Sequence, residues 1–516
     1  MLRTGHETYP GTQAKSYGRA SPGDRSTASP PTTLFDPDDD ALHEECGVVG
    51  VFGVDDAAAH AALALHALQH RGQEAAGIVT FDGQRFNAER HLGLVGDNFN
   101  SHDVMDRLNG DMSVGHVRYS TAGGMTIRNV QPLFAHLSDG GMTVCHNGNL
   151  TNAQTLQREL VSDGAIYQST SDTEVILHLV ARSRRQRPVE RIIEALRRLE
   201  GAYAIIAMTE TMLIGARDPV GIRPLIIGRK DGGYVLASET CALDIMGATF
   251  EREVENGEVV VITKDGLESH RPFPIRPARP CIFEFIYFAR PDSVVAGQSV
   301  YDVRKRMGRE LAAEQPADVD VVVPVPDGGV PAALGYAQAA GHPFEFGIIR
   351  NNYVGRTFIE PAQQIRQLGV KLKHSANGAA VRGRRIVLID DSVVRGTTSI
   401  KLVSLMFEAG AREVHLRVAC PEIKFGDFYG IDTPTRQELL ASTMTVEEMR
   451  DHIGATSLGF LSVEGLYRAM GCEARNPAAP QFTDHCFTGD YPTPLTDIDG
   501  ELQMNQKQLS LLAEAR

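Results

Sequence analysis

Two hydrophobic patterns follow one another along this chain. From residue 46 to about 280, short apolar runs are separated by glycine-rich turns, with apolar helical stretches between them. Such a mixture predicts an α+β domain in which helices cover the faces of sheets. The predicted strands are 46–53, 113–121, 142–152, 202–208 and 234–240, and the predicted helices are 57–72 and 173–183.

From residue 281 to about 480, single apolar runs alternate with helical stretches. The strands expected here are 319–326, 384–391 and 413–420, and the helices are 331–341 and 398–411. This alternation predicts an α/β domain, a parallel sheet wrapped by helices. Residues 267–280 contain four prolines and few apolar side chains, which favours a linker between the two domains.

Both ends of the chain lack a core pattern. Residues 1–45 are rich in glycine, proline, serine, threonine and charge. Such a segment buries too little apolar surface to offset its ordering entropy, so we expect a disordered leader or propeptide. Residues 481–516 are predicted to form a C-terminal tail with an amphipathic stretch at 505–515. The expected organisation is therefore a leader, a domain over 46–280, a domain over 281–480 and a tail.

Charge and cysteine content narrow the class of protein. The 516 residues carry a formal net charge of -14, which argues against a general nucleic-acid or membrane-surface partner. No apolar stretch is long enough to cross a bilayer. The seven cysteines are sparse and lack a repeating spacing. A disulfide framework is therefore not expected, and a reducing, cytoplasmic compartment fits better.

The string IVLIDDSVVRGTTSI, residues 386–400, carries the sharpest chemical signal. An apolar strand ends in two acids, and a short loop then enters a helix. Ligands bind at the carboxyl ends of parallel strands, and a helix start offers N–H groups and a positive dipole end to phosphate. Two acids after a strand are also a common helix start, but the whole string favours a sugar-phosphate site. Its residues are Asp390, Asp391, Arg395, Gly396, Thr397 and Thr398, of which the two acids could also assist a divalent metal.

A basic stretch supports this interpretation. Residues 350–373 carry three arginines and two lysines but a single acid, Glu360. We expect a mobile lid over pyrophosphate, with Arg356 and Lys371 among its contacts. A solvated surface loop is the alternative. The whole 386–400 string resembles the phosphoribosyl-pyrophosphate (PRPP) signature of type I phosphoribosyltransferases.

Cys46 stands at the head of the first apolar strand and has two interpretations. It is a small buried hydrophobe, or removal of residues 1–45 makes it an N-terminal nucleophile whose own α-amine acts as the base. An amide-cleaving thiol also needs a carboxylate clamp, oxyanion donors and an acid for the substrate ammonium. Arg118 suits the first task, Asn147 and the N–H of Gly148 suit the second, and Asp172 suits the third.

These motifs, following ECGVVGV, closely resemble the N-terminal-nucleophile (Ntn) glutaminase domain of class II amidotransferases. The stretch 68–78 matches that family too and adds Arg71 as a glutamine-binding candidate near the nucleophile. A glutaminase domain followed by a type I phosphoribosyltransferase domain is similar to the amidophosphoribosyltransferase family. Residues 218–225 and 281–301 also look like that family.

The resemblance implies an enzyme of the first committed step of de novo purine synthesis. Glutamine, PRPP and water would give 5-phosphoribosylamine, glutamate and pyrophosphate, with ammonia channelled between two sites and Mg²⁺ as the cofactor. It also implies a homotetramer inhibited by purine nucleotides.

The sequence departs from the family pattern in two places. Gly328 stands where a serine or threonine often follows the acid, so no hydroxyl contact to the metal is expected there.

The second departure concerns an iron–sulfur cluster, which we expect to be absent. Some relatives hold a [4Fe–4S] cluster with four cysteine thiolates. Two of the corresponding positions are Cys281 and Cys486, but the other two are Asp427 and Thr483. Cys420 and Cys472 lie elsewhere along the chain, so using them would require the local backbone to be re-routed.

Two other functions stay open at this stage. Another class II amidotransferase would join the same first domain to a different acceptor domain, but the chain has no ATP loop of the SGGxDS type, and the 386–400 string argues for PRPP. A PRPP-sensing regulator would need no nucleophile at Cys46 and would normally carry a basic DNA-binding segment, which is absent here.

Overall fold

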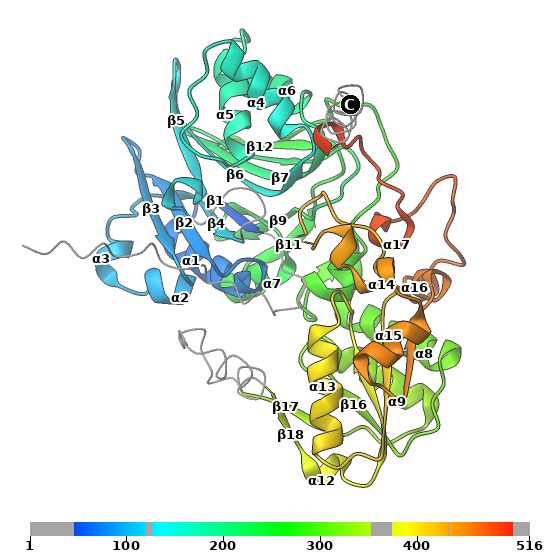
Figure 1. The fold of residues 1–516 in the computed structure, drawn as a ribbon. Helices are drawn as coiled ribbons and strands as arrows, with labels where there is room; N and C mark the ends of the chain where they lie inside the picture. Colours follow the sequence, from blue (N-terminus) through cyan, green and yellow to red (C-terminus); the bar gives the residue numbers. More distant parts are fainter. Residues whose placement is uncertain (1–45, 120–125, 352–373, 432, 499–516) are drawn as a thin grey trace, which may run out of the picture. The chain divides into compact units, whose positions relative to one another are not determined.

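The computed structural model describes residues 46–119, 126–351, 374–431 and 433–498, all of which belong to one compact unit (Figure 1). The expectations for the leader 1–45, for most of the basic stretch and for the amphipathic stretch at 505–515 lie outside these residues. No helix among the described residues is long and apolar enough to cross a membrane.

Seven of the described strands form the first sheet, with antiparallel pairing between neighbours. Helices α1 (Ala57–Ala67) and α7 (Thr240–Met246) cover its outer face, where alanine and leucine side chains pack against β1. In sheet order the strands are β11 (Thr249–Glu253), β9 (Ile226–Lys230), β10 (Gly233–Ala237), β1 (Gly47–Phe52), β4 (Met112–Arg118), β2 (Ala75–Phe81) and β3 (Phe86–Leu92).

Six further strands of the described chain form a second antiparallel sheet. Its outer face packs on α4 (Ala153–Ser162), α5 (Thr173–Arg182) and α6 (Pro188–Leu196). Its inner face shares an apolar core with the first sheet, formed by residues such as Val48, Val114, Ile206 and Val260. The first domain therefore consists of two packed sheets between two layers of helices. In order the strands are β13 (Gly266–His270), β12 (Val259–Thr263), β8 (Leu213–Arg217), β7 (Gly201–Thr209), β6 (Gly140–Leu150) and β5 (Leu133–Leu137).

The second domain is built on a parallel sheet, as its sequence pattern predicts. Within the described residues its order is β16 (Val321–Pro324), β19 (Arg385–Asp390), β20 (Glu413–Val418) and β21 (Ser457–Phe460). Every residue of β16 and all but the first of β19 are buried, which explains the unbroken apolar runs. The main helices around it are α8 (Val300–Glu314), α9 (Val330–Ala340), α13 (Thr397–Glu408), α15 (Val446–Ile453) and α16 (Val463–Ala469).

Short elements complete the described chain. The helical ones are α2 (Val95–Asn98), α3 (His102–Met105), α12 (Gly378–Val381), α14 (Leu440–Thr443), α17 (His485–Thr488), the 3₁₀ turns η1 (Gln69–Arg71), η2 (Ile127–Asn129) and η4 (Arg436–Glu438), and a π-helical turn, η3 (Glu284–Phe288). The strands are β14 (Val294–Val295), β15 (Gln298–Ser299), β17 (Ile348–Arg350) and β18 (His374–Ala376).

The predicted strands and helices are present, with ends that differ by a few residues. The linker expected at 267–280 is partly wrong, because residues 267–270 belong to the edge strand β13, paired with β12. Most of these residues are polar, so the segment lacks the apolar run that predicts a strand. An edge strand tolerates such residues because one of its sides is not paired with another strand. Residues 481–498 return to the first domain, where Asp497 accepts hydrogen bonds from the backbone N–H groups of Gln154 and Thr155 at the start of α4 (2.8 and 2.9 Å).

Candidate active sites

Cys46 lies at the entrance to β1, a central strand of the first sheet. Gly47, the first residue of β1, pairs with Val117, so the entrance to β1 lies beside the end of β4 at Arg118. Both side chains are buried. The Cys46 thiol donates to the carbonyl oxygen of Tyr119 at 3.8 Å. The structure therefore brings together the predicted nucleophile and the predicted carboxylate clamp.

The predicted oxyanion donors lie on β6. Asn147 is fully buried, and neither its amide nitrogen nor its amide oxygen has a hydrogen-bond partner among the described residues. Gly148 has φ +129°, and a Cβ there would come within 2.2 Å of the Ala202 carbonyl oxygen. Only glycine fits this position, so the backbone beside Asn147 is held in a conformation that the sequence alone does not reveal.

Asp172 contacts the last residue of β6, Leu150. It precedes α5, and its Oδ2 accepts a hydrogen bond from Leu150 N–H (3.1 Å) and lies 3.5 Å from His146 Nδ1. Burial raises the pKa of the Asp172 carboxyl, but the His146 imidazole and the hydrogen bonds outweigh burial, so the pKa lies below its usual value. The carboxylate is therefore charged at neutral pH and can pair with an ammonium group.

Two buried histidines connect these strands, and the sequence analysis did not single them out. His116, on β4 two residues before Arg118, lies with its Nε2 at 3.3 Å from the carbonyl oxygen of His146. Burial lowers the pKa of His116 to about 3, so the imidazole is neutral. His146 immediately precedes Asn147. The contact therefore joins β4, which ends at Arg118, to β6, which carries Asn147.

In the second domain, Asp390 ends the central strand β19 and Asp391 follows it directly, as predicted. Both are largely buried. The N–H of Asp391 donates to Asp390 Oδ1 (2.9 Å), and the Ser392 hydroxyl donates to Asp391 Oδ1 (2.8 Å). Burial raises the pKa of the Asp391 carboxyl to about 6. The paired acids lie at the carboxyl edge of the parallel sheet, where α/β folds bind ligands.

The loop after these acids turns into α13. Gly396 has φ +79° and is the residue before the first helical position, Thr397. Thr397 and Thr398 occupy the first turn, so their N–H groups lie at the positive end of a helix of twelve residues. The Arg395 guanidinium lies 3.6 Å from the Glu438 carboxylate. Arg356 and Lys371 lie outside the described residues.

Asp390 and Asp391 offer carboxylate oxygens at the edge of the sheet. A Cβ at Gly328 would lie 1.7 Å from Asp391 Oδ2, so only glycine allows this oxygen to approach the backbone so closely. Carboxylate oxygens are the ligands that Mg²⁺ prefers. Arg304, which the sequence analysis did not identify, is buried nearby and lowers the pKa of Asp391 electrostatically. Its guanidinium is fixed by the carbonyl oxygens of Phe285 and Ala289 (2.8 and 2.9 Å).

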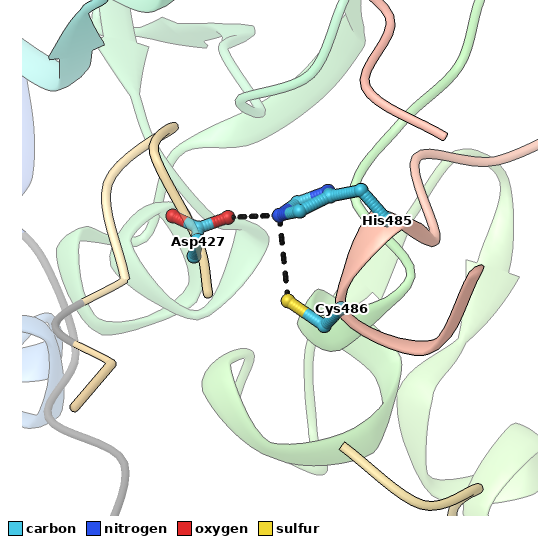
Figure 2. Close-up of side chains that lie close together, drawn as sticks. All are labelled: Asp427, His485 and Cys486. Atoms are coloured by element: carbon cyan, nitrogen blue, oxygen red, sulfur yellow. Dashed lines mark hydrogen bonds and ion pairs between the residues drawn. The ribbon is translucent and has the colours of Figure 1, made fainter. Parts of the chain in front are cut away.

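The four positions that correspond to cluster ligands in some relatives are all buried. Cys281 and Thr483 form a parallel β-bridge. The Thr483 hydroxyl donates to the carbonyl oxygen of Arg279 (2.5 Å). Asp427 faces His485 and Cys486, with ligand atoms of all three within 4.8 Å of one another (Figure 2).

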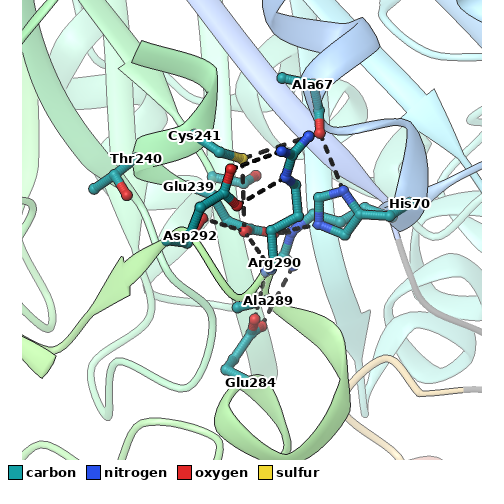
Figure 3. Close-up of polar contacts among 12 residues, drawn as sticks. Ala67, His70, Glu239, Thr240, Cys241, Glu284, Ala289, Arg290 and Asp292 are labelled. Atoms are coloured by element: carbon teal, nitrogen blue, oxygen red, sulfur yellow. Dashed lines mark hydrogen bonds and ion pairs between the residues drawn. The ribbon is translucent and has the colours of Figure 1, made fainter. Parts of the chain in front are cut away.

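Arg71 belongs to a buried ion cluster that joins the two domains. Figure 3 shows two of its members, Glu239 and Glu284. Its Nε contacts Glu239, at the start of α7, and its Nη2 contacts Glu284, in the π-helical turn. The Glu239 carboxylate also lies 2.7 Å from His70 Nε2. Arg223 Nη1 lies 3.4 Å from Glu284 Oε1. These contacts of Arg71 are with carboxylates of the chain, and its predicted contact with glutamine stays a prediction.

The sequence contains a pattern that predicts a buried ion pair at this cluster. Glu284 interrupts the apolar run CIFEFIYF, and a lone charge in such a run indicates a buried ion pair. Burial raises the pKa of Glu239, but Arg71 and His70 outweigh burial and hold that pKa well below its usual value. Glu239 is therefore ionised, and Glu284 is in contact with both Arg71 and Arg223.

Comparisons with known proteins agree with this geometry. A family model described as a glutamine amidotransferase domain matches residues 116–244, which include Arg118, Asn147 and Asp172. A model described as a phosphoribosyl transferase domain matches residues 292–429, which include the paired acids. The chain is thus a glutamine amidotransferase joined to a phosphoribosyltransferase.

Relatives that match nearly the whole chain specify the family. An amidophosphoribosyltransferase of Rhizobium etli is 62% identical over 482 residues, covering 92% of this chain and 97% of that protein. The amidophosphoribosyltransferase of Bacillus subtilis is 48% identical over 456 residues, covering 88% and 95%. A solved B. subtilis glutamine PRPP amidotransferase, complexed with ADP and GMP, has a TM-score of 0.83 at 46% identity and covers 87% of this chain and 98% of that one. The chain belongs to the amidophosphoribosyltransferase family, the enzymes of the first step of purine biosynthesis.

Proposed function

We propose that this chain converts glutamine, PRPP and water into 5-phosphoribosylamine, glutamate and pyrophosphate. The observation that carries the proposal is the buried Cys46 thiol, which donates to the carbonyl oxygen of Tyr119, the residue after Arg118, at 3.8 Å. Ammonia released in the first domain would pass inside the protein to C1 of PRPP in the second. A glutaminase with another acceptor domain and a PRPP sensor both agree less well with relatives that match over 92% of the chain.

In the glutaminase half, Cys46 would attack the side-chain amide of glutamine. Arg118 binds the α-carboxylate of glutamine, and Asp172 binds its α-ammonium group. The negative charge that develops on the amide oxygen is stabilised by Asn147 Nδ2 and the Gly148 N–H. Ammonia leaves with a proton supplied by the α-amine of Cys46, and water then hydrolyses the thioester.

In the transferase half, the start of α13 would hold the 5-phosphate of PRPP. The N–H groups and hydroxyls of Thr397 and Thr398 donate to its oxygens, and Arg395 adds positive charge. The carboxylates of Asp390 and Asp391 would accept hydrogen bonds from the ribose hydroxyls. They would also hold Mg²⁺, which, when bound, neutralises charge on the departing pyrophosphate. Arg356 and Lys371 are proposed to cover the pyrophosphate, and Arg71 to support the glutamine site.

Replacing the nucleophile tests the proposal. For Cys46→Ala, glutamine-dependent formation of phosphoribosylamine should fall more than about 10³-fold, because no thioester can form. Ammonia at high pH should still support synthesis, since the second site is intact. Cys472→Ala, outside both sites, is the control and should keep both activities. Retained glutamine-dependent turnover in Cys46→Ala would show that the nucleophile is assigned wrongly.

The proposal also requires that residues 1–45 are removed, because the α-amine of Cys46 is the base. The N-terminal residue of purified active protein is therefore expected to be Cys46. An active enzyme that still begins at Met1 would contradict this part of the mechanism.

We further propose that the chain holds no [4Fe–4S] cluster. Thr483 offers no thiolate, and its hydroxyl is used by the Arg279 carbonyl oxygen. Asp427 Oδ2 is used by two backbone N–H groups, those of Tyr429 and Ile431. Protein purified anaerobically should be colourless, without stoichiometric iron and sulfide. A brown preparation with about four irons per chain would overturn this proposal.

Partners and compartment complete the proposed function. The B. subtilis relative is complexed with ADP and GMP, which supports purine nucleotides as feedback inhibitors here. A homotetramer is proposed from the family resemblance. The seven cysteines form no disulfide bonds with one another, which supports a reducing, cytoplasmic location.

A further inference from the structure

Asp427, His485 and Cys486 form a compact cluster that neither proposed site uses. Asp427 lies in the segment after β20, and the other two residues begin α17. All three side chains are buried. Figure 2 shows the carboxylate approaching the imidazole from one side and the thiol approaching the same ring nitrogen from another.

The carboxylate of Asp427 is oriented by the backbone. Its Oδ2 accepts hydrogen bonds from the N–H groups of Tyr429 (2.8 Å) and Ile431 (2.6 Å). These two bonds turn Oδ1 toward His485. Oδ1 lies 2.6 Å from His485 Nε2, at ion-pair distance.

The imidazole is oriented by aromatic rings. Its ring packs edge-on to Tyr429 (centroids 5.1 Å apart) and against Tyr491 (4.9 Å). The Cys486 Sγ lies 3.3 Å from Nε2. A carboxylate oxygen, an imidazole nitrogen and a sulfur thus converge from fixed directions, and their mutual distances are all within 4.8 Å.

The three ligand atoms are held together by contacts with one another. His485 Nε2 lies 2.6 Å from Asp427 Oδ1 and 3.3 Å from Cys486 Sγ. A cation between the three atoms would bind the oxygen, the nitrogen and the sulfur together.

The donor set selects the metal. Thiolate and imidazole ligands favour zinc over Mg²⁺ and Ca²⁺, which take oxygen ligands. Zinc–ligand bonds of about 2.0–2.3 Å in a tetrahedron separate the donor atoms by roughly 3.3–3.8 Å. The Sγ–Nε2 distance of 3.3 Å already fits. The Nε2–Oδ1 pair, at 2.6 Å, would have to open by under about 1 Å.

We propose that Asp427 Oδ1, His485 Nε2 and Cys486 Sγ bind one zinc ion. On binding, the Cys486 thiol gives up its proton to solvent and a zinc–sulfur bond forms, with no change of oxidation state. The ion links the segment after β20 to the start of α17 and so stabilises the return of the chain toward the first domain. This inference does not depend on the proposed reaction.

Metal analysis of the full chain tests the proposal. Protein purified and then equilibrated with zinc and dialysed should hold about one zinc per chain. His485→Gln and Cys486→Ser should each lower the zinc content at least about 10-fold. The matched control is Cys472→Ser, which removes a thiol outside the cluster and should retain zinc.

Cobalt gives a second readout that does not depend on the variants folding. Intact wild-type protein, stripped of zinc and titrated with Co²⁺, should show a sulfur-to-cobalt charge-transfer band and tetrahedral d–d bands. Both should disappear when zinc is added. Wild-type protein that takes up neither metal would overturn the proposal, as would folded His485→Gln and Cys486→Ser variants with unchanged zinc. Iron with acid-labile sulfide at these residues would overturn it too.

Discussion

At the scale of single residues, Asn147 stands out because a buried amide without a hydrogen-bond partner is costly. Neither polar atom of its side chain is bonded within the described chain. Such a group is retained where a reacting atom will use it. The geometry agrees with a donor that forms its hydrogen bond only with the oxyanion of the bound substrate.

Asn147→Ala is therefore expected to lower kcat for glutamine hydrolysis by about 10²–10³-fold with little change in KM. Ammonia-dependent synthesis should be unaffected, because the loss concerns only the amide-cleaving step. Steady-state kinetics with each nitrogen source measures the difference.

The matched control is Asn152→Ala. The Asn152 amide donates to the carbonyl oxygen of Arg198 (2.9 Å), so its loss should lower the melting temperature and leave kcat unchanged. An Asn147→Ala enzyme with normal kcat would remove this residue from the oxyanion site.

At the scale of elements, buried acids lie at one end of β19 and more exposed acids lie near its other end. Its carboxyl end carries the buried pair Asp390 and Asp391. At its other end, Arg385 forms ion pairs with the exposed Asp318 (2.5 Å) and with Asp320 (2.9 Å). Only the carboxyl end of a parallel strand faces the ligand crevice, so the two ends should respond differently to loss of charge.

Replacing both Asp390 and Asp391 with Asn should abolish synthesis with either glutamine or ammonia. The ribose hydroxyls and the metal would lose their carboxylate partners. Basal glutaminase activity should survive, because the thiol site lies in the other domain. Asp318→Asn is the control at the opposite end of the strand and should keep full activity. Unchanged PRPP affinity in the double variant would contradict the assignment.

The same strands explain how far the sequence alone could reach. Strands such as β16 and β19 are buried on both faces and therefore read as unbroken apolar runs. The motifs that start at Cys46 and at Asp390 were found because catalysis requires particular residue types within a few positions of an element's end. The edge strand β13 was missed because none of its residues is buried and it therefore lacks an apolar run.

The long-range contacts of the chain could not be predicted from the sequence. The ion cluster of Arg71, Glu239 and Glu284 joins residues that are up to 213 positions apart. Nothing in the local pattern states which charges will meet, because the pairing depends on how two domains pack. The orphaned amide of Asn147 is equally invisible, since it is defined by what does not contact it among the described residues.

At the scale of the whole molecule, that ion cluster couples the stability of the domains. Glu284→Gln would leave the buried Arg71 and Arg223 with one carboxylate fewer. Breaking a buried pair from one side is strongly destabilising, so we expect a loss on the order of 3 kcal/mol. Urea denaturation followed by fluorescence from the chain's 13 tyrosines measures it.

The control for this prediction is Asp292→Asn. Its ion pair with Arg290 (2.6 Å) is about half exposed, and exposed pairs contribute less than about 1 kcal/mol. Equal effects of Glu284→Gln and Asp292→Asn would show that the buried cluster does not couple the domains.

The contacts of Asp497 have a consequence for the order in which the protein can mature on the ribosome. Helix α4 has no cap from its own preceding side chain, and the N–H groups of Gln154 and Thr155 bond instead to a carboxylate that is 343 and 342 residues away. Domains generally fold in order of synthesis, yet this one keeps uncapped helix amides until almost the whole chain has been translated. Nascent glutaminase domains are therefore expected to remain open at α4 and to close only after residue 497 has left the exit tunnel.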